Sequence, residues 1–358
     1  MKTVIFHDFF IDIGGGGKVV NILSKYLKAP IVTCFYDKSN LSTIQNTKIF
    51  HDNSFFNKLK SIRELKLIRT IYFFNHKLKK LKNFFNENFD SAIFSGFYSI
   101  YFARFLEIYK IYYIQAEPLS YIFERENYKS LITYKYIYEL FLKKLERDSI
   151  FSFDKTIANS NYIKKVYEEK FGIKVNKIIY PPVDTSKFYY REPEDYFLLV
   201  SRLYPYKRVD VVAKVFTKIP SKKLVIVGSG PLASYIRRLS QRYKNIKYLG
   251  KVSEKKLIEL YARCNAVIYI SEKEPFGLVP LEANSAGKPA IVANEGGLTE
   301  GIIPFKTGLI LDPPYESNLK EVIENFDKYH FSKIDCIKNA KRFDKKVFLK
   351  NFLRELKN

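Results

Sequence analysis

Residues 271–302 read SEKEPFGLVPLEANSAGKPAIVANEGGLTEGI, and this stretch decides the fold class. The apolar run 266–270 before it predicts a buried parallel strand. Lys288 and Pro289 predict the end of a helix, and the apolar run 290–293 predicts the next strand. In a strand–helix–strand unit, the loop that follows the first strand lies at the carboxyl edge of a parallel sheet. Open α/β sheets bind their ligands at this edge.

Two glutamates of this stretch, Glu274 and Glu282, are separated by seven residues. Glu274 is expected at the entrance of the helix, and Glu282 about two turns further along roughly the same face. The helix start is expected to present backbone amides at Phe276, Gly277 and Leu278. Carboxylates beside such amides suit a ligand that carries both hydroxyl groups and anionic oxygens, as a nucleotide sugar does.

The stretch resembles the E-x7-E signature of retaining glycosyltransferases of the GT-B fold, especially glycosyltransferase family 4. The resemblance rests on PFGLVPLEA at 275–283 and on GKPAIVANEGGLTE at 287–300. It implies an α/β protein with two Rossmann-like, doubly wound parallel-sheet domains and a cleft between them. The alternative is an ordinary strand–helix–strand unit with surface glutamates, which would be preferred if the two glutamates stood alone.

Strand and helix patterns alternate in both halves of the chain, which by itself predicts two doubly wound sheets. Residues 1–183 are expected to form an N-terminal, acceptor-side domain, and residues 184–334 a C-terminal domain that binds the nucleotide sugar. Prolines 181 and 182 mark the boundary. The tail 335–358 is predicted to be helical, and the resemblance implies that it packs back on the N-terminal domain.

Composition excludes several classes of protein. The apolar content of 47% is ample for two cores, so the chain is not a disordered protein. No apolar run approaches the length of a transmembrane helix, and Met1 is expected to lead into a first strand rather than a signal peptide. Cys34 and Cys264 lie in apolar runs and are expected to be buried thiols in a reducing compartment, and no Cys/His cluster has metal-ligand spacing.

The formal net charge of +24 predicts an acidic partner, which is nucleotide phosphate, an anionic membrane face or nucleic acid. Residues 53–86 combine nine lysines and arginines, one glutamate and apolar residues at helical spacing. This pattern is typical of helices that contact a membrane interface, and it predicts a cytoplasmic protein that binds the inner face of the membrane. The alternative is a helical pair packed on its own domain with lysines in water.

Arg202 and Lys207 follow the first predicted strand of the C-terminal half. With Ser201, Leu203 and Arg208 they resemble the S-R-L-x-x-x-K-G motif of the family, whose Arg and Lys bind the donor diphosphate. Such transferases have no metal to neutralise the leaving diphosphate, so fixed cations must do so. Arg208 replaces the usual glycine, which predicts a tighter loop or a third cation. The alternative is a solvated basic loop.

Two glycine-rich stretches are expected near the donor. The turn GSGP that begins at Gly228 resembles the G-x-G-P turn of the family. Residues 11–17 are predicted to form a turn in which Gly15 and Gly16 let backbone amides approach phosphate or sugar. This turn resembles the G-G-x-E loop of the family, with Gly17 in place of the glutamate. A plain flexible turn is the alternative.

Three residues of the N-terminal half are candidates for contact with the acceptor or the sugar: Asp8, Gln115 and Glu117. Gln115 stands where many relatives have a histidine that touches the donor sugar. A glutamine can hydrogen-bond a hydroxyl but cannot transfer a proton, so Glu117 is a possible substitute. His7 is expected to be structural or to face the acceptor.

The resemblance implies a retaining glycosyltransferase that moves a hexose from a UDP-, GDP- or ADP-sugar to an acceptor hydroxyl, lipid-linked or on a glycan or protein. It assigns the diphosphate to Arg202 and Lys207, the sugar hydroxyls to Glu274 and the ribose to Glu282, with no metal or cofactor. Arg202, Lys207 and Glu274 are therefore the expected catalytic residues.

Two other interpretations stay open at this point. The positive charge also fits a nucleic-acid-binding protein built on Rossmann-like domains, although no recognised nucleic-acid motif is present. The replacements at Gln115 and Gly17 also fit a family member that has lost its activity.

Overall fold

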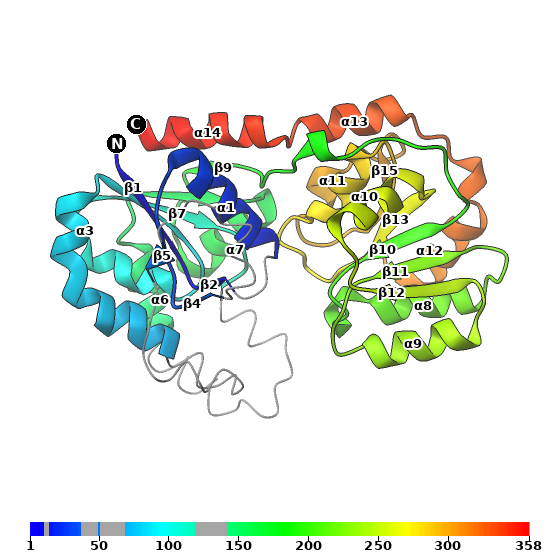
Figure 1. Cartoon of the computed structure of the whole chain (residues 1–358), viewed down its shortest axis with the longest axis horizontal. Coiled ribbons are helices and arrows are strands. Elements are labelled where there is room, and N and C mark those ends of the chain that lie inside the picture. The colour runs from blue at the N-terminus through cyan, green and yellow to red at the C-terminus, as the bar shows by residue number, and fades with distance from the viewer. Residues whose placement is uncertain (11–13, 37–48, 51–68, 119–141, 358) are drawn as a thin grey trace. The chain divides into compact units, whose positions relative to one another are not determined.

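The computed structural model divides into two units (Figure 1). The first unit consists of Met1–Ile179 and Asn351–Asn358, and the second of Tyr180–Lys350. The structure describes the following residues: 1–10, 14–36, 49–50, 69–118 and 142–357.

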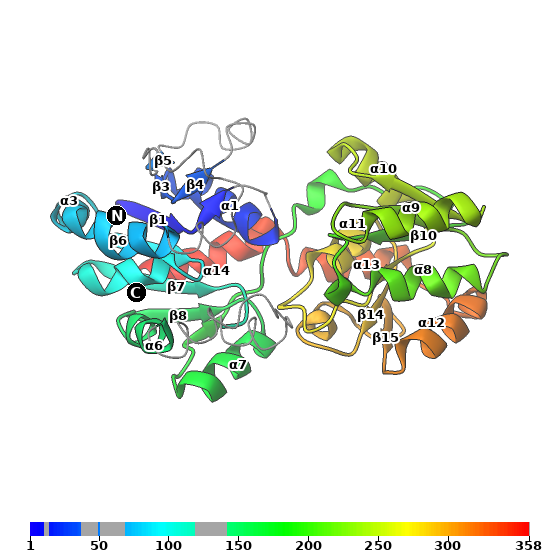
Figure 2. The same ribbon diagram turned by 90° about the horizontal axis from the view of Figure 1, so that it is seen from below.

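A parallel sheet forms the centre of the first unit. Within the described residues it has seven strands in the order β5-β3-β1-β6-β7-β8-β9, and Figure 2 shows β3, β1, β6, β7 and β8 in this succession. The strands are β1 (Thr3–His7), β3 (Ile31–Val32), β5 (Ile49–Phe50), β6 (Ser91–Ser95), β7 (Tyr109–Ile114), β8 (Lys155–Ala158) and β9 (Lys177–Ile178). The short strands β2 (Phe9–Phe10) and β4 (Phe35–Tyr36) pair separately.

Helices flank this sheet. Among the described residues they are α1 (Gly15–Leu27), α3 (Lys82–Asn88), α6 (Lys143–Ile150), α7 (Asn161–Phe171) and the last turns of α14 (Lys345–Lys357), with the π-helix η3 (Phe73–Lys77) and the 3-10 helices η4 (Leu78–Leu81) and η5 (Ser99–Phe105). The aromatic content of the sequence fills the core, where Phe6 of β1 stacks on Phe94 of β6 at 4.6 Å between ring centres. Ser160 caps the start of α7, because its hydroxyl accepts from the Ile163 amide at 3.1 Å.

The second unit also has a parallel sheet. Its described strands follow the order β12-β11-β10-β13-β14-β15, and Figure 1 shows β13, β10, β11 and β12 in this succession. They are β10 (Phe197–Val200), β11 (Leu224–Val227), β12 (Ile246–Gly250), β13 (Ala266–Tyr269), β14 (Ala290–Ala293) and β15 (Gly308–Leu311). The helices are α8 (Val209–Thr217), α9 (Ala233–Arg242), α10 (Glu254–Arg263), α11 (Leu278–Ser285), α12 (Tyr315–Glu324) and α13 (Lys333–Lys341).

Both faces of this sheet are covered, which is why every strand except the edge strand β12 is apolar throughout. Phe197 and Leu199 of β10 pack in a core with residues of α8, α9 and α12. Leu198 points to the other face and packs in a second core with residues of α10 and α11. Successive side chains along a strand therefore pack in two cores, one on each face of the sheet, as a doubly wound sheet requires.

The division between the units falls after Ile179, four residues before the boundary expected at 183. Tyr180 belongs to the second unit because its ring stacks on Phe276 at 5.2 Å and meets Phe343 at 5.3 Å. The prolines at 181 and 182 therefore follow the boundary instead of marking its exact place.

The expected tail 335–358 is also shared differently between the units. Helix α13 packs on α11 in the second unit, where the side-chain amide of Asn339 donates to Asn284 Oδ1 at 2.8 Å. Only residues from Asn351 onward belong to the first unit, and there Phe352 packs edge-on against Tyr113 at 5.5 Å. The predicted return of the C-terminal helix to the N-terminal unit thus applies to the last turns of α14.

Two expectations from composition concern membranes and cysteines. Within the described ranges, none of the helices has both the length and the apolar character needed to cross a bilayer. Cys34 and Cys264 are buried, as predicted.

Candidate active site

The order of the strands selects one place in the second unit. Strands β10 and β13 are neighbours in the sheet, but the chain first visits β11 and β12 on the far side of β10 before it returns to β13. The loops that leave β10 and β13 therefore diverge at their carboxyl ends, and such a switch point is where doubly wound sheets bind ligands. Lys207 lies in the first of these loops and Glu274 in the second.

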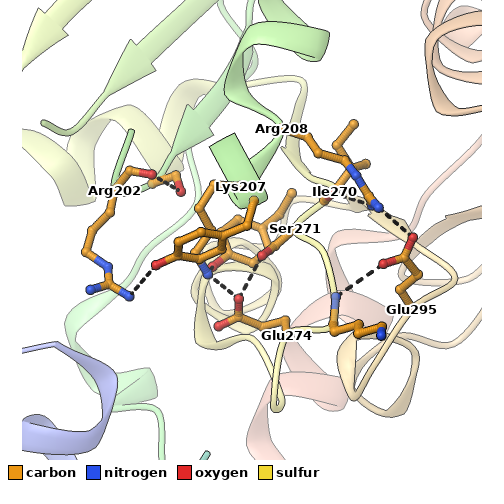
Figure 3. Close-up of polar contacts among 11 residues, drawn as sticks. Arg202, Lys207, Arg208, Ile270, Ser271, Glu274 and Glu295 are labelled. Carbon is orange, nitrogen blue, oxygen red and sulfur yellow. Dashed lines mark hydrogen bonds and ion pairs between the residues drawn. The ribbon is translucent and has the colours of Figure 1, made fainter. Parts of the chain in front are cut away.

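Lys207 and Glu274 form a largely buried ion pair at this switch point (Figure 3). Their side chains are 7% and 18% exposed. The Lys207 ammonium donates to Glu274 Oε2 and, at 3.1 Å, to the Tyr269 hydroxyl, while the Ser271 hydroxyl donates to the same Oε2 at 2.9 Å. Burying two charges is costly, and these added hydrogen bonds are what such a pair needs.

The electrostatics keep Glu274 ionised. Burial alone would raise the pKa of Glu274, but the charge and the hydrogen bond of Lys207 outweigh it, so the pKa lies below its usual value. Arg202 lowers the pKa of Glu274 further by its charge. An ionised carboxylate only accepts hydrogen bonds, so Glu274 is suited to binding hydroxyl groups.

Arg202 is the exposed cation of this site. Its guanidinium donates to the Tyr206 hydroxyl at 3.0 Å (Figure 3). It also lies 5.7 Å from the centre of the Tyr204 ring, and the side chain is exposed. The side chain is therefore aligned by two tyrosines while it stays open to solvent. It combines with Lys207 to give two fixed positive charges beside one carboxylate.

The turn that begins at Gly228 supports the loop that carries Arg202. Gly228 has φ +139°, and a Cβ atom there would lie 1.7 Å from the Ser201 carbonyl oxygen. The Leu203 amide donates to the Ser229 carbonyl at 2.9 Å. The two segments touch through their backbones, so Gly228 is required by close approach.

The relation between the two signature glutamates differs from the expected one. Helix α11 begins at Leu278 and not at Glu274, because Gly277 at φ +92° interrupts the backbone just before it. Glu274 therefore lies in a loop, and the prediction that it shares a helix face with Glu282 is wrong. Glu282 lies within α11 and accepts from the Tyr261 hydroxyl at 2.7 Å.

The amides expected from Phe276 to Leu278 lie at the start of α11, where backbone N–H groups have no partner within the helix. The Phe276 side chain is only 2% exposed, and it packs between Tyr180 and Phe343. This aromatic contact anchors the loop between Glu274 and the helix in the second unit.

In the first unit, Gly15 and Gly16 are helical. Helix α1 starts at Gly15, and the Lys18 amide donates to the Gly14 carbonyl at 3.0 Å, so the predicted turn over 11–17 is corrected from Gly15 onward. Residues 11–13 of that turn lie outside the described residues. The side-chain amide of Gln115 donates to the Ser95 hydroxyl and, at 3.5 Å, to the Gly16 carbonyl. The structure thus brings Gly16 and Gln115 together at the carboxyl ends of β6 and β7.

Asp8 has a structural contact that its sequence position did not reveal. Its carboxylate accepts from the amides of Phe97, Tyr98 and Ser99 at 2.6, 3.0 and 2.7 Å, so it caps the start of η5. Both carboxylate oxygens are engaged in a buried position, so Asp8 has a structural role, and its contact with an acceptor stays a prediction.

The other two candidates of the first unit also have protein partners. His7 contacts the Ser95 carbonyl through Nδ1, in agreement with a structural role. Glu117 is buried and accepts from the Tyr162 hydroxyl.

The sequence did not point to several residues of the site: Tyr206, Tyr269, Ser271 and Glu295. From the sequence, Tyr269 is only part of the apolar run 266–270. The signal that could identify it is a hydroxyl-bearing residue near the carboxyl end of the predicted strand, and β13 in fact ends at Tyr269. Among the residues that the structure describes, no group of three or more His, Cys, Asp or Glu side chains is placed to hold a metal ion.

The second unit is similar to a known protein family. Residues 184–343 match the family model of glycosyl transferases group 1. An uncharacterized glycosyltransferase of Methanocaldococcus jannaschii is 27% identical over 54% of this chain and 55% of its own length. A second one from the same organism is 37% identical over 34% of this chain and 33% of its own. The matches thus span about half or less of these curated relatives.

The fold is also found among solved structures. A crystal structure of HepE from Anabaena in complex with UDP matches over 100% of both chains, with a TM-score of 0.74 and 19% identity. This similarity shows that the α/β architecture is the GT-B fold. Residues 184–343, which include Lys207 and Glu274, are thus similar to the glycosyl transferases group 1 family.

Proposed function

We propose that the protein is a retaining glycosyltransferase that moves a hexose from a nucleoside diphosphate sugar to an acceptor hydroxyl. The observation that carries the proposal is the Lys207–Glu274 pair at the switch point, with the exposed Arg202 beside it. Two cations suit a diphosphate, and one ionised carboxylate suits sugar hydroxyls, so the charges match the two halves of a nucleotide sugar.

Arg202 and Lys207 hold the diphosphate in this proposal. An ammonium group has three N–H donors. Glu274 and Tyr269 accept two of those of Lys207, and the third is directed to a phosphate oxygen. The guanidinium of Arg202 presents a planar fork to the same phosphates. As the sugar–phosphate bond breaks, negative charge grows on the diphosphate, and these cations stabilise it.

Glu274 orients the donor sugar. Its Oε2 atom accepts from Lys207 and Ser271, and its Oε1 atom accepts from a sugar hydroxyl in the complex. Glu282 accepts from the ribose hydroxyls, and the amides at the start of α11 bind sugar or phosphate oxygens. In the first unit, Gly15, Gly16 and Gln115 remain proposed ligand contacts.

The reaction needs no residue that forms a covalent intermediate. The acceptor oxygen attacks the anomeric carbon from the face that the diphosphate leaves. The carbon–phosphate oxygen bond breaks, the new glycosidic bond forms, and the acceptor proton passes to the departing phosphate oxygen. The configuration at the anomeric carbon is retained. Because Arg202 and Lys207 supply the positive charge, the transfer is proposed to be independent of metal.

The acceptor is proposed to be lipid-linked or part of a glycan, at the inner face of a membrane. The part of the basic segment 53–86 that precedes residue 69 lies outside the described residues. In the described part, Leu81 and Phe84 are 47% and 41% exposed among Lys79, Lys80 and Lys82. Exposed apolar side chains among lysines support contact with an anionic membrane surface.

Thermal-shift measurements with UDP-, GDP- and ADP-sugars test the proposal, because a bound donor stabilises the fold by mass action. UDP-sugars come first, since the similar Anabaena structure contains UDP. A donor that raises the Tm of the wild type should not raise that of Arg202→Ala, and its turnover should persist in EDTA. If none of the donors shifts the Tm or is turned over, the proposed function is wrong.

A further inference from the structure

Glu295 links the two residues that flank the Lys207–Glu274 pair. Its Oε1 atom accepts from the Arg208 guanidinium at 2.7 Å, and its Oε2 atom accepts from the Lys273 backbone amide at 3.2 Å (Figure 3). Arg208 directly follows Lys207, and Lys273 directly precedes Glu274. The Glu295 carboxylate therefore contacts the residue after Lys207 and the residue before Glu274.

Both flanking residues have left-handed backbones. Arg208 has φ +49° and Lys273 has φ +41°. A residue with a Cβ atom is strained in this region and stays there only where its surroundings hold it. For Arg208 the holding contacts are Glu295, the Ile270 carbonyl at 3.2 Å, and the Tyr315 ring, whose centre lies 4.4 Å from the guanidinium.

The two glycines after Glu295 lie in close contact with the backbone of Glu274. A Cβ atom at Gly296 would lie 2.4 Å from the Glu274 carbonyl oxygen. The Gly297 amide donates to that same carbonyl at 2.8 Å. The segment 295–297 thus fixes the Glu274 loop twice, through a side chain and through direct backbone contact.

The charge of Arg208 is neutralised within this cluster. The side chains of Arg208 and Glu295 are 19% and 24% exposed. Burial would raise the pKa of Glu295, but the hydrogen bonds of Arg208 and Tyr315 outweigh it and lower the pKa, so the carboxylate is charged at neutral pH. Of the two outcomes predicted from Arg208, the geometry favours the tighter loop over a third cation for the diphosphate.

We propose that Arg208 and Glu295 are positioning residues that set the geometry of Lys207 and Glu274 before the donor binds. The inference rests on the proposed function of that pair. A phosphate that binds Lys207 weakens its attraction to Glu274, because the ammonium charge is then shared. The Arg208–Glu295 link holds the two loops in place while this happens.

Four substitutions test the inference. Arg208→Gly removes the link but suits a left-handed backbone, so the variant should fold. Arg208→Lys keeps the charge but cannot reach two acceptors with a planar fork. Glu295→Gln keeps the shape and removes the charge. The control Asp327→Asn breaks another ion pair of the same unit, in which Lys222 lies 2.7 Å from Asp327.

All three site variants should lower kcat roughly 10- to 100-fold, because small misplacements of catalytic groups cost that much. The KM for the donor and the affinity for UDP should change less than about threefold, since neither residue binds the donor. The double variant Arg208→Gly/Glu295→Gln should be no slower than the slower single variant, since the two act as a unit. The control should keep the wild-type kcat.

Three results would overturn the inference. Wild-type kcat in Arg208→Gly and Glu295→Gln would show that the link does not position the pair. Near-normal turnover in Arg208→Lys, with weakened UDP binding in Arg208→Gly, would make Arg208 a donor-binding cation. If the control Asp327→Asn loses kcat as well, and kcat falls in proportion to Tm in all variants, the role of Arg208 and Glu295 is purely structural. If the wild type neither binds UDP nor transfers sugar from any donor, the proposed function fails as well, and that result is distinct from the other three.

Discussion

Glu355, in the last turns of α14, forms an ion pair with Lys155, the first residue of β8, at 3.0 Å. Lys177 of β9 lies 2.6 Å from the other carboxylate oxygen. The side chain of Glu355 is 8% exposed, so this carboxylate joins the C-terminal helix to two strands of the first unit in a largely buried position. The contact leads to a prediction about stability.

Glu355→Gln should lower the free energy of unfolding by about 1–3 kcal/mol at neutral pH, because Lys155 loses its charged partner in a largely buried position. Burial opposes ionisation of Glu355, but the hydrogen bonds of Lys177 and Lys155 outweigh it and hold its pKa below the usual 4.5. Its stabilisation is therefore complete above pH 4.5 and is lost as the pH falls through the lower folded value.

Scanning calorimetry at several pH values checks this prediction. The Tm difference between wild type and variant should shrink as the pH falls below 4.5. Glu316→Gln is the matched control, since Glu316 also pairs with two lysines, Lys214 and Lys218, but these are 55% and 50% exposed. Its Tm should change less. Equal shifts in both variants would argue against a special role for Glu355.

Arg202→Ala and Lys207→Ala should both reduce turnover, each by roughly 2–4 kcal/mol in the activation free energy, because a developing anion loses a cation. Only Lys207→Ala should also lower the Tm, since it leaves the carboxylate of Glu274 buried without its ion-pair partner. Steady-state kinetics and thermal melts separate the two effects. Near-normal turnover in both variants would contradict the assignment.

Gly228→Ala should destabilise the second unit by roughly 1–3 kcal/mol, because an alanine Cβ would meet the Ser201 carbonyl and φ is +139°. Turnover should fall with it, because the displaced carbonyl belongs to the residue before Arg202. Gly14→Ala is the control, since nothing lies within 4 Å of a Cβ there and φ is −72°. Urea unfolding would show whether the two variants differ as expected.

Replacement of Lys79, Lys80 and Lys82 by serine should weaken binding to anionic vesicles. Each lysine near such a surface contributes about 1 kcal/mol, and salt screens the attraction. Co-sedimentation at low and high salt measures the effect, and transfer to a soluble acceptor should hardly change.

A second basic helix provides the control for charge alone. Helix α9 carries three exposed arginines: Arg237, Arg238 and Arg242. Serine at these positions should leave vesicle binding nearly intact if the exposed Leu81 and Phe84 are part of the membrane contact. Equal losses in the two triple variants, or a wild type that ignores the vesicles, would refute the proposed surface.

Local signals in the sequence were sufficient to predict many of the helices and strands. Strand β14 has the predicted bounds Ala290–Ala293. Helix α10 begins directly after Ser253, whose hydroxyl accepts from the Lys256 amide at 3.3 Å. Capping residues and apolar periodicity act over a few residues, so they are legible in the sequence. The sequence does not predict that α1 starts at Gly15, because glycine is a poor helix former. Its helical backbone depends on the residues around it.

Long-range contacts were not legible. The sequence predicted Lys207 and Glu274 as partners of one ligand, but not that they pair with each other 67 positions apart. Arg208 and Glu295 are separated by 87 positions, and only the strand order brings their loops to one switch point. Glu274 is expected from the sequence to share a helix face with Glu282, whereas Lys273 and Gly277, which both have positive φ, keep it in a loop.

The assignment of residues 351–358 to the first unit has a consequence for synthesis of the chain. A growing polypeptide leaves the ribosome from its N-terminus, and domains commonly fold as they emerge. Here the buried ring of Tyr113 receives its partner Phe352 only after residues 180–350 of the second unit have been translated. The first unit is therefore completed only after the second unit has been made.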